Sequence, residues 1–184
     1  MKAHNKISNS SQMHPTLQLA WQHCEEVRQE LLVVLHKVTA TDWLRRPTPT
    51  TWTIAEQVDH LIRSEIGTSK MSRKLIGGAY NGAKHSIGAK FFTAALDIYP
   101  YGPTMAPQEL VPTVDLPFSE AFNTLATTHR RFYQELTALD GGDPELLESP
   151  DPATGVWFTL GGWIQLQALH EAHHLQQIIK LLEN

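Results

Sequence analysis

The sequence is poor in cysteine, in long apolar runs and in uncompensated positive charge. Its 184 residues include one cysteine, Cys24, which excludes an internal disulfide and fits a reducing compartment. No stretch approaches the roughly 18 uninterrupted apolar residues of a membrane span. Residues 1–14 hold no apolar run that could serve as a signal peptide. We therefore expect a soluble, cytoplasmic protein with no membrane partner.

The charge balance of the chain is slightly acidic. Lys and Arg total 15 against 19 Asp and Glu, which gives a net charge of −4. The chain lacks a basic stripe of the kind that follows phosphates, and this argues against nucleic acid as a partner. No internal repeat is visible. The length suits a single domain over residues 1–184, with residues 1–14 as a flexible N-terminal tail.

Apolar residues recur at helical spacing in four segments of the chain. A capping box of Thr53 and Glu56 opens the second segment, Ser119 is the expected N-cap of the third, and Cys24 shares the apolar face of the first. We therefore expect Cys24 to be buried rather than reactive. Four helices favour an all-α four-helix bundle over any α/β arrangement. The predicted helices cover residues 15–38, 53–75, 119–139 and 160–182.

The connection between the second and third helices, residues 77–117, is unusually long and holds many of the glycines and prolines. Connections of this length in compact domains are often functional. Residues 91–96 could form a short helix over the bundle, and Tyr99 and Tyr101 could reach the mouth of a pocket. A crossover that covers one end of the core is equally consistent with the sequence.

The segment His-Glu-Ala-His-His at residues 170–174 points to a metal. His170 and His174 are four apart on one helix face, so their nitrogens can converge on one ion at about 2.0–2.1 Å. The segment also matches the H-E-x-x-H pattern of metalloproteases, but only Glu183 follows as a third ligand, which disfavours that interpretation. His60 is the best upstream candidate. If the second and fourth helices pack antiparallel, His60 lies level with His174.

Polar residues interrupt the apolar face of the fourth helix, and burying each without a partner costs on the order of 1–3 kcal/mol. A metal accounts for them, as does a hydrogen-bonded core network, and the spacing favours the metal. Glu171 is a candidate general base, an acceptor that orients a histidine, or a solvated surface residue. His173 points about 100° away and is not a predicted ligand. His129 is either a satisfied core histidine or an additional pocket group.

Two motifs carry a resemblance to a known family. Residues 52–61 (WTIAEQVDHL) and 170–178 (HEAHHLQQI) resemble the DinB/YfiT-like superfamily, and helix order agrees over most of the chain. The resemblance implies a four-helix bundle of up-down-down-up topology with a long crossover between helices two and three. It assigns metal binding to His60, His170 and His174, implies a divalent transition metal, nickel or zinc, and implies a homodimer.

The resemblance says less about the reaction than about the site. Its characterised members include S-transferases for low-molecular-weight thiols and a thiol-dependent isomerase, while others are described as metal-dependent hydrolases. Three histidine ligands leave a coordination position open. We therefore expect an enzyme on a small molecule, of thiol S-transferase or hydrolase type, with Glu171 as its catalytic residue. The alternatives are a non-catalytic metal-binding or scaffold bundle, and a core with no metal.

Overall fold

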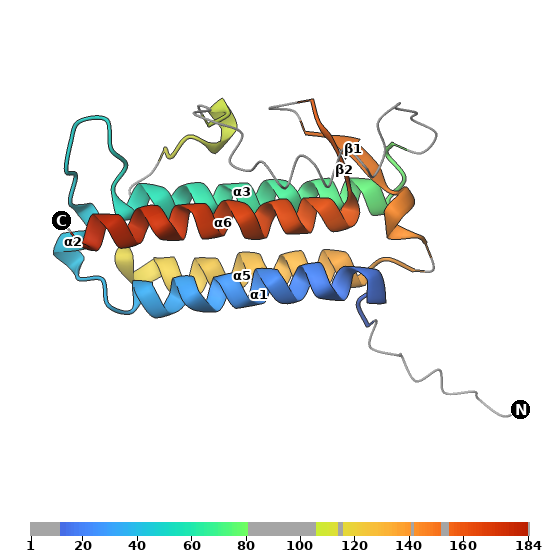
Figure 1. Ribbon diagram of the computed structural model, residues 1–184, viewed down its shortest axis with the longest axis horizontal. Helices are drawn as coiled ribbons and strands as arrows, with labels where there is room; N and C mark the ends of the chain where they lie inside the picture. The colour runs from blue at the N-terminus through green and yellow to red at the C-terminus, as the bar shows by residue number, and fades with distance from the viewer. Residues whose placement is uncertain (1–11, 81–105, 114–115, 141, 152–154, 184) are drawn as a thin grey trace, which may run out of the picture.

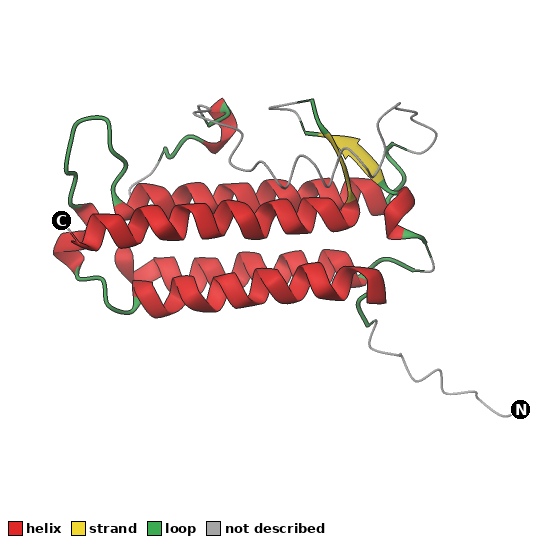
Figure 2. Ribbon diagram, in the orientation of Figure 1, coloured by secondary structure: helices red, strands yellow, loops and turns green. Residues whose placement is uncertain are grey.

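The computed structural model describes residues 12–80, 106–113, 116–140, 142–151 and 155–183. Within these ranges four long helices lie side by side along one axis (Figures 1 and 2). Two of them, α1 and α6, run in one direction, and α3 and α5 run in the opposite one, which confirms the predicted up-down-down-up bundle. The four helices are α1 (Pro15–Leu35), α3 (Ile54–Ile76), α5 (Phe118–Thr137) and α6 (Leu160–Glu183).

Short elements that the periodicity did not predict lie in the connections between the long helices. Two three-residue strands pair antiparallel, with Ser149 opposite Phe158, and the second strand leads directly into α6. The indole Nε1–H of Trp163 donates to Ser149 Oγ at 2.9 Å, which ties this hairpin to α6. The short elements are α2 (Ala40–Leu44), η1 (Gln108–Leu110), η2 (Pro144–Leu146), β1 (Glu148–Pro150) and β2 (Trp157–Thr159).

The start of α3 is set by the predicted capping box. The backbone N–H of Glu56 donates to Thr53 Oγ1 at 3.1 Å, and the N–H of Thr53 donates to Glu56 Oε2 at 2.8 Å. Two backbone donors that the helix leaves unpaired are thereby satisfied. The helix ends at Ile76, followed by Gly78 at a φ of 80°, a conformation that favours glycine. His60 is thus placed two turns inside a well-defined helix.

Two predicted helix boundaries differ from the structure. The first long helix stops at Leu35 because the chain turns into α2, whose capping box begins at Thr39. The third begins at Phe118 with Pro117 as its N-cap, so the prediction of Ser119 as the cap was wrong. Pro117 has no N–H and a fixed φ, and both suit the entry to a helix.

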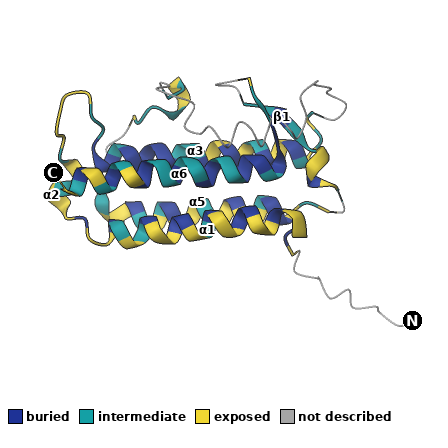
Figure 3. Cartoon of the chain, in the orientation of Figure 1, coloured by how far each residue is buried: buried dark blue, intermediate teal, exposed yellow. Residues whose placement is uncertain are grey.

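The core lies between the inward faces of the four helices, where buried residues follow one side of each ribbon (Figure 3). Cys24 is buried as predicted, its Sγ–H donates to the Ile164 carbonyl, and burial raises the pKa of its thiol. Met13, in the segment predicted as a tail, is also buried. None of the helices in the described ranges is both long and apolar enough to cross a membrane.

Part of the long connection returns to the bundle. Its residues 81–105 lie outside the described ranges, and so do the predicted short helix at 91–96 and both Tyr99 and Tyr101. The described part includes η1, which packs against α3. The carbonyl of Leu110, at the end of η1, lies 2.8 Å from Nδ1 of His60. The crossover therefore contributes directly to the surroundings of a candidate ligand.

Candidate metal centre

The antiparallel packing of α3 and α6 brings His60, His170 and His174 together. One ring nitrogen from each lies within 4.8 Å of the others, and Nε2 of His60 is 2.9 Å from Nε2 of His170. The three ring centroids are 4.7–4.8 Å apart. A tetrahedral ion with bonds of about 2.0–2.1 Å separates its nitrogen ligands by roughly 3.3–3.4 Å, so small ring movements would accommodate one.

Hydrogen bonds at the far side of two rings leave their Nε2 atoms available. Nδ1–H of His60 donates to the Leu110 carbonyl, and Nδ1–H of His174 donates to Gln57 Oε1. Each contact assigns the proton to Nδ1, so the lone pair of each ring lies on Nε2, the nitrogen that would face a metal. His170 Nδ1 is buried and has no hydrogen-bond partner among the described residues. The donor set therefore fits a transition metal that prefers imidazole nitrogen.

Trp52 forms an aromatic wall beside the three histidines. Its ring lies nearly parallel to that of His174, with an interplanar angle of 14° and a centroid separation of 6.3 Å. It also tilts against His60 at a centroid distance of 4.9 Å. Trp52 immediately precedes the Thr53 cap, so the element that starts α3 also places this wall. An apolar wall here limits the access of water to the ring nitrogens.

Burial keeps the three imidazoles neutral. Desolvation lowers the pKa of His60, although the hydrogen bond to Leu110 opposes it. Desolvation, followed by repulsion from the neighbouring histidines, lowers the pKa of His170 well below its usual value and that of His174 to about 3. Neutral imidazole is the form that binds metals, so the site is ready for a metal at neutral pH.

We expect the metal-free protein to lose stability as the pH falls from about 6.5 towards 3. In this window the unfolded chain protonates His174 while the folded chain does not, so acid favours unfolding. At pH 4.5 this histidine alone should cost about 2–3 kcal/mol relative to pH 7.5. Urea unfolding of chelator-treated protein at both pH values measures the change. His174→Gln should show a smaller loss, and an equal loss in both proteins would contradict the assignment.

Glu171 is held by an arginine from another helix. Its Oε1 and Oε2 accept from Nε and Nη2 of Arg28 at 2.6 and 2.7 Å. The pair is buried, with 3% of the Arg28 and 4% of the Glu171 side chain exposed. This two-point contact links α1 to α6 at the residue that follows His170. The catalytic role of Glu171 stays a prediction.

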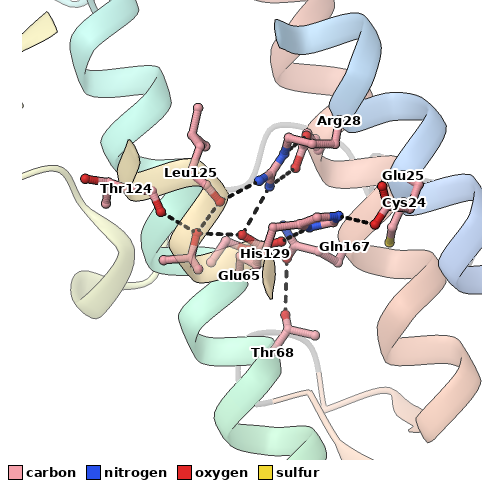
Figure 4. Close-up of polar contacts among 12 residues, drawn as sticks. Cys24, Glu25, Arg28, Glu65, Thr68, Thr124, Leu125, His129 and Gln167 are labelled. Atoms are coloured by element: carbon pink, nitrogen blue, oxygen red, sulfur yellow. Dashed lines mark hydrogen bonds and ion pairs between the residues drawn. The ribbon is translucent and has the colours of Figure 1, made fainter. Parts of the chain in front are cut away.

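The same arginine belongs to a buried network that sequence analysis missed (Figure 4). Nη2 of Arg28 lies 3.1 Å from Glu65 Oε2, and Nη1 donates to the Leu125 carbonyl. His129 lies between Glu65 Oε1 and Glu25 Oε1, at 2.6 and 3.1 Å. Although burial opposes ionisation, the His129 hydrogen bond and Arg28 hold the pKa of Glu65 below its usual value. His129 is thus a largely buried, hydrogen-bonded histidine that links α5 to α3 and α1.

A signal for this network is present in the sequence. Arg28 follows Cys24 by four residues and precedes Leu31 by three, so it falls on the apolar stripe of the first helix. Glu65 is likewise a charged residue on the buried side of its helix, α3, and it is 1% exposed. A charged residue on a buried stripe requires a charged or hydrogen-bonding partner. Which residues supply that partner depends on helix packing rather than on local spacing.

The fold and the facing imidazoles define the class: a four-helix bundle with a three-histidine cluster suited to a metal. The sequence profile of the DinB superfamily matches residues 23–178, and the chain belongs to this superfamily. The crystal structure of TT2238, a four-helix bundle protein, is similar at a TM-score of 0.60 and 20% identity. That likeness covers 88% of this chain and 97% of TT2238, and it shows the fold. Among curated proteins, none matches this chain.

Proposed function

We propose that the protein is a metal-dependent enzyme that acts on a small molecule. His60, His170 and His174 hold a divalent transition metal, nickel or zinc, in this proposal. The observation that carries it is the convergence of three neutral imidazoles, two of which, those of His60 and His174, have their outer nitrogens fixed by the Leu110 carbonyl and by Gln57. When bound, such a metal supplies Lewis acidity, which lowers the pKa of a water or thiol at the open position.

The surrounding residues have separate roles in the proposed site. Gln57 and the Leu110 carbonyl orient the rings of His174 and His60. Trp52 limits access of water and offers an aromatic surface to the substrate. Glu171 is the proposed catalytic carboxylate, and its contact with Arg28 fixes its position beside His170. Thiol S-transfer and hydrolysis both fit these groups.

Metal analysis of protein purified without an affinity tag tests the proposal first. We expect about one metal per chain, or the uptake of one nickel or zinc ion on reconstitution. Turnover of electrophiles with added thiols, or of small esters and amides, should then disappear with a chelator and return with the metal. Failure to bind either ion would overturn the proposal. Stoichiometric metal with no turnover in either screen would favour the non-catalytic scaffold.

Gln57→Leu is expected to weaken the affinity for zinc by about 10–100-fold, the usual effect of removing an outer partner of a ligating histidine. The substitution removes the acceptor of His174 Nδ1–H and frees the ring to rotate. Gln57→Glu is the matched control because it keeps an acceptor oxygen at the same chain length. Competition with a chromophoric chelator measures both affinities. Equal weakening in the two variants would show that Gln57 does not act through its acceptor.

A further inference from the structure

A cavity lies on a different seam of the bundle from the three histidines. Helix α1 packs against α6, and α5 packs against α3, which leaves a groove between α1 and α5. The groove has a volume of about 390 Å³, within the range of small-molecule sites, roughly 300–1,000 Å³. The histidines lie between α3 and α6 instead, so a ligand in this groove would not touch them.

The walls of the groove favour a flat aromatic group. Trp21 stacks on His129 with a centroid separation of 4.5 Å and an interplanar angle of 21°. Tyr133 tilts against Trp21 at 5.5 Å and is 40% exposed, and Leu32 adds an aliphatic surface from α1. Aromatic rings gain most from offset or edge contacts with other rings. The exposed part of Tyr133 offers such a contact at the groove.

The charges that line the groove leave one cation without a partner. Arg28, at the base, is bound by Glu171 and Glu65. Each ring nitrogen of His129 lies within hydrogen-bonding distance of a carboxylate, one of Glu65 and the other of Glu25. Arg130 also lines the groove, is exposed and has no ion-pair partner among the described residues. A planar guanidinium binds a carboxylate with matched geometry.

We propose that the groove between α1 and α5 binds a small aromatic carboxylate. The ring packs against the exposed Tyr133, beside the largely buried Trp21–His129 stack, and the carboxylate pairs with Arg130. Glu25, on the opposite wall, disfavours a second negative group on the ligand. The site is separate from the proposed metal centre, so binding requires neither the metal nor the three histidines.

The test titrates the full chain with indole-3-acetate and with indole-3-acetamide, which has the same ring and no charge. We expect saturable binding of the acid by calorimetry, and weaker binding of the amide. Arg130→Gln should weaken binding of the acid about tenfold, as expected for loss of a charge-assisted hydrogen bond. Arg131→Gln is the matched control. It makes the same charge change at an exposed residue that lines a different face of α5, and should leave binding unchanged.

Two further variants locate the ligand. Ala126 is exposed and lines the groove, so Ala126→Trp should fill it and abolish binding without disturbing the core. His170→Ala should leave binding of the acid unchanged, which separates this proposal from the metal site. The proposal is overturned if no saturable binding occurs at millimolar concentrations, or if acid and amide bind equally. It is equally overturned if the two arginine variants behave alike, or if Ala126→Trp still binds.

Discussion

Replacing Arg28 with methionine is expected to lower the free energy of unfolding by about 3–5 kcal/mol. The guanidinium is buried and is the shared partner of Glu171 and Glu65. Methionine fills a similar volume, but it leaves Glu171 without a counter-charge in a setting of low dielectric constant. Urea denaturation at pH 7, with the slope of the transition compared between wild type and variant, measures the loss.

Two comparisons separate the burial of charge from the removal of a side chain. Arg46→Met breaks a pair with Glu56 in which 40% and 24% of the side chains are exposed, and should cost about 1 kcal/mol or less. The double variant Arg28→Met/Glu171→Leu removes both charges of the Arg28–Glu171 pair, while Glu65 keeps its contacts with His129 and Thr128, so most of the lost stability should be recovered. If Arg28→Met lowers the free energy of unfolding no more than Arg46→Met does, the buried network of Arg28, Glu171 and Glu65 does not stabilise the packing of the helices.

Alanine at His60, His170 or His174 is expected to reduce the metal content from about one per chain to nearly none. Loss of an outer partner alone costs about 10–100-fold in affinity, so loss of a ligand should cost more than about 100-fold. Mass spectrometry gives the stoichiometry, and chelator competition gives the affinity. This expectation rests on the proposed metal, and circular dichroism of each variant shows whether the bundle still folds.

His173→Ala is the matched control for this series. His173 lies on the same helix between the proposed ligands, but its Nε2 contacts the amide of Gln177 instead of the cluster. The control should therefore bind metal as the wild type does. A ligand variant that keeps full metal affinity would remove that histidine from the site. Loss of metal in His173→Ala would show that the series reports on folding rather than on ligation.

Much of the fold follows from local patterns that the structure reproduces. The predicted cap at Thr53 sets the level of His60, and helical spacing places His170 and His174 on one face. Antiparallel packing of α3 and α6 then brings the three together, because residues at matched levels of facing helices meet. Periodicity and capping are properties of short segments, which explains why sequence analysis could use them.

The features that sequence analysis missed depend on distant contacts. Arg28 meets Glu171 across 143 positions of the chain, and His60 meets Leu110 across 50. The hairpin of β1 and β2 has only three residues in each strand, too few for alternation to stand out. The hydrogen bond that Gln57 accepts from His174 could not be predicted either, because His174 lies on a different helix, α6.

The contact between His60 and Leu110 has a consequence for how this protein can diverge during evolution. The crossover reaches the histidine through a main-chain carbonyl, so any residue that keeps the path of the chain can supply the same acceptor. Drift in amino-acid identity at position 110 is therefore compatible with an intact site. An insertion or deletion that displaces this stretch would cost the histidine its acceptor even if every ligand were retained.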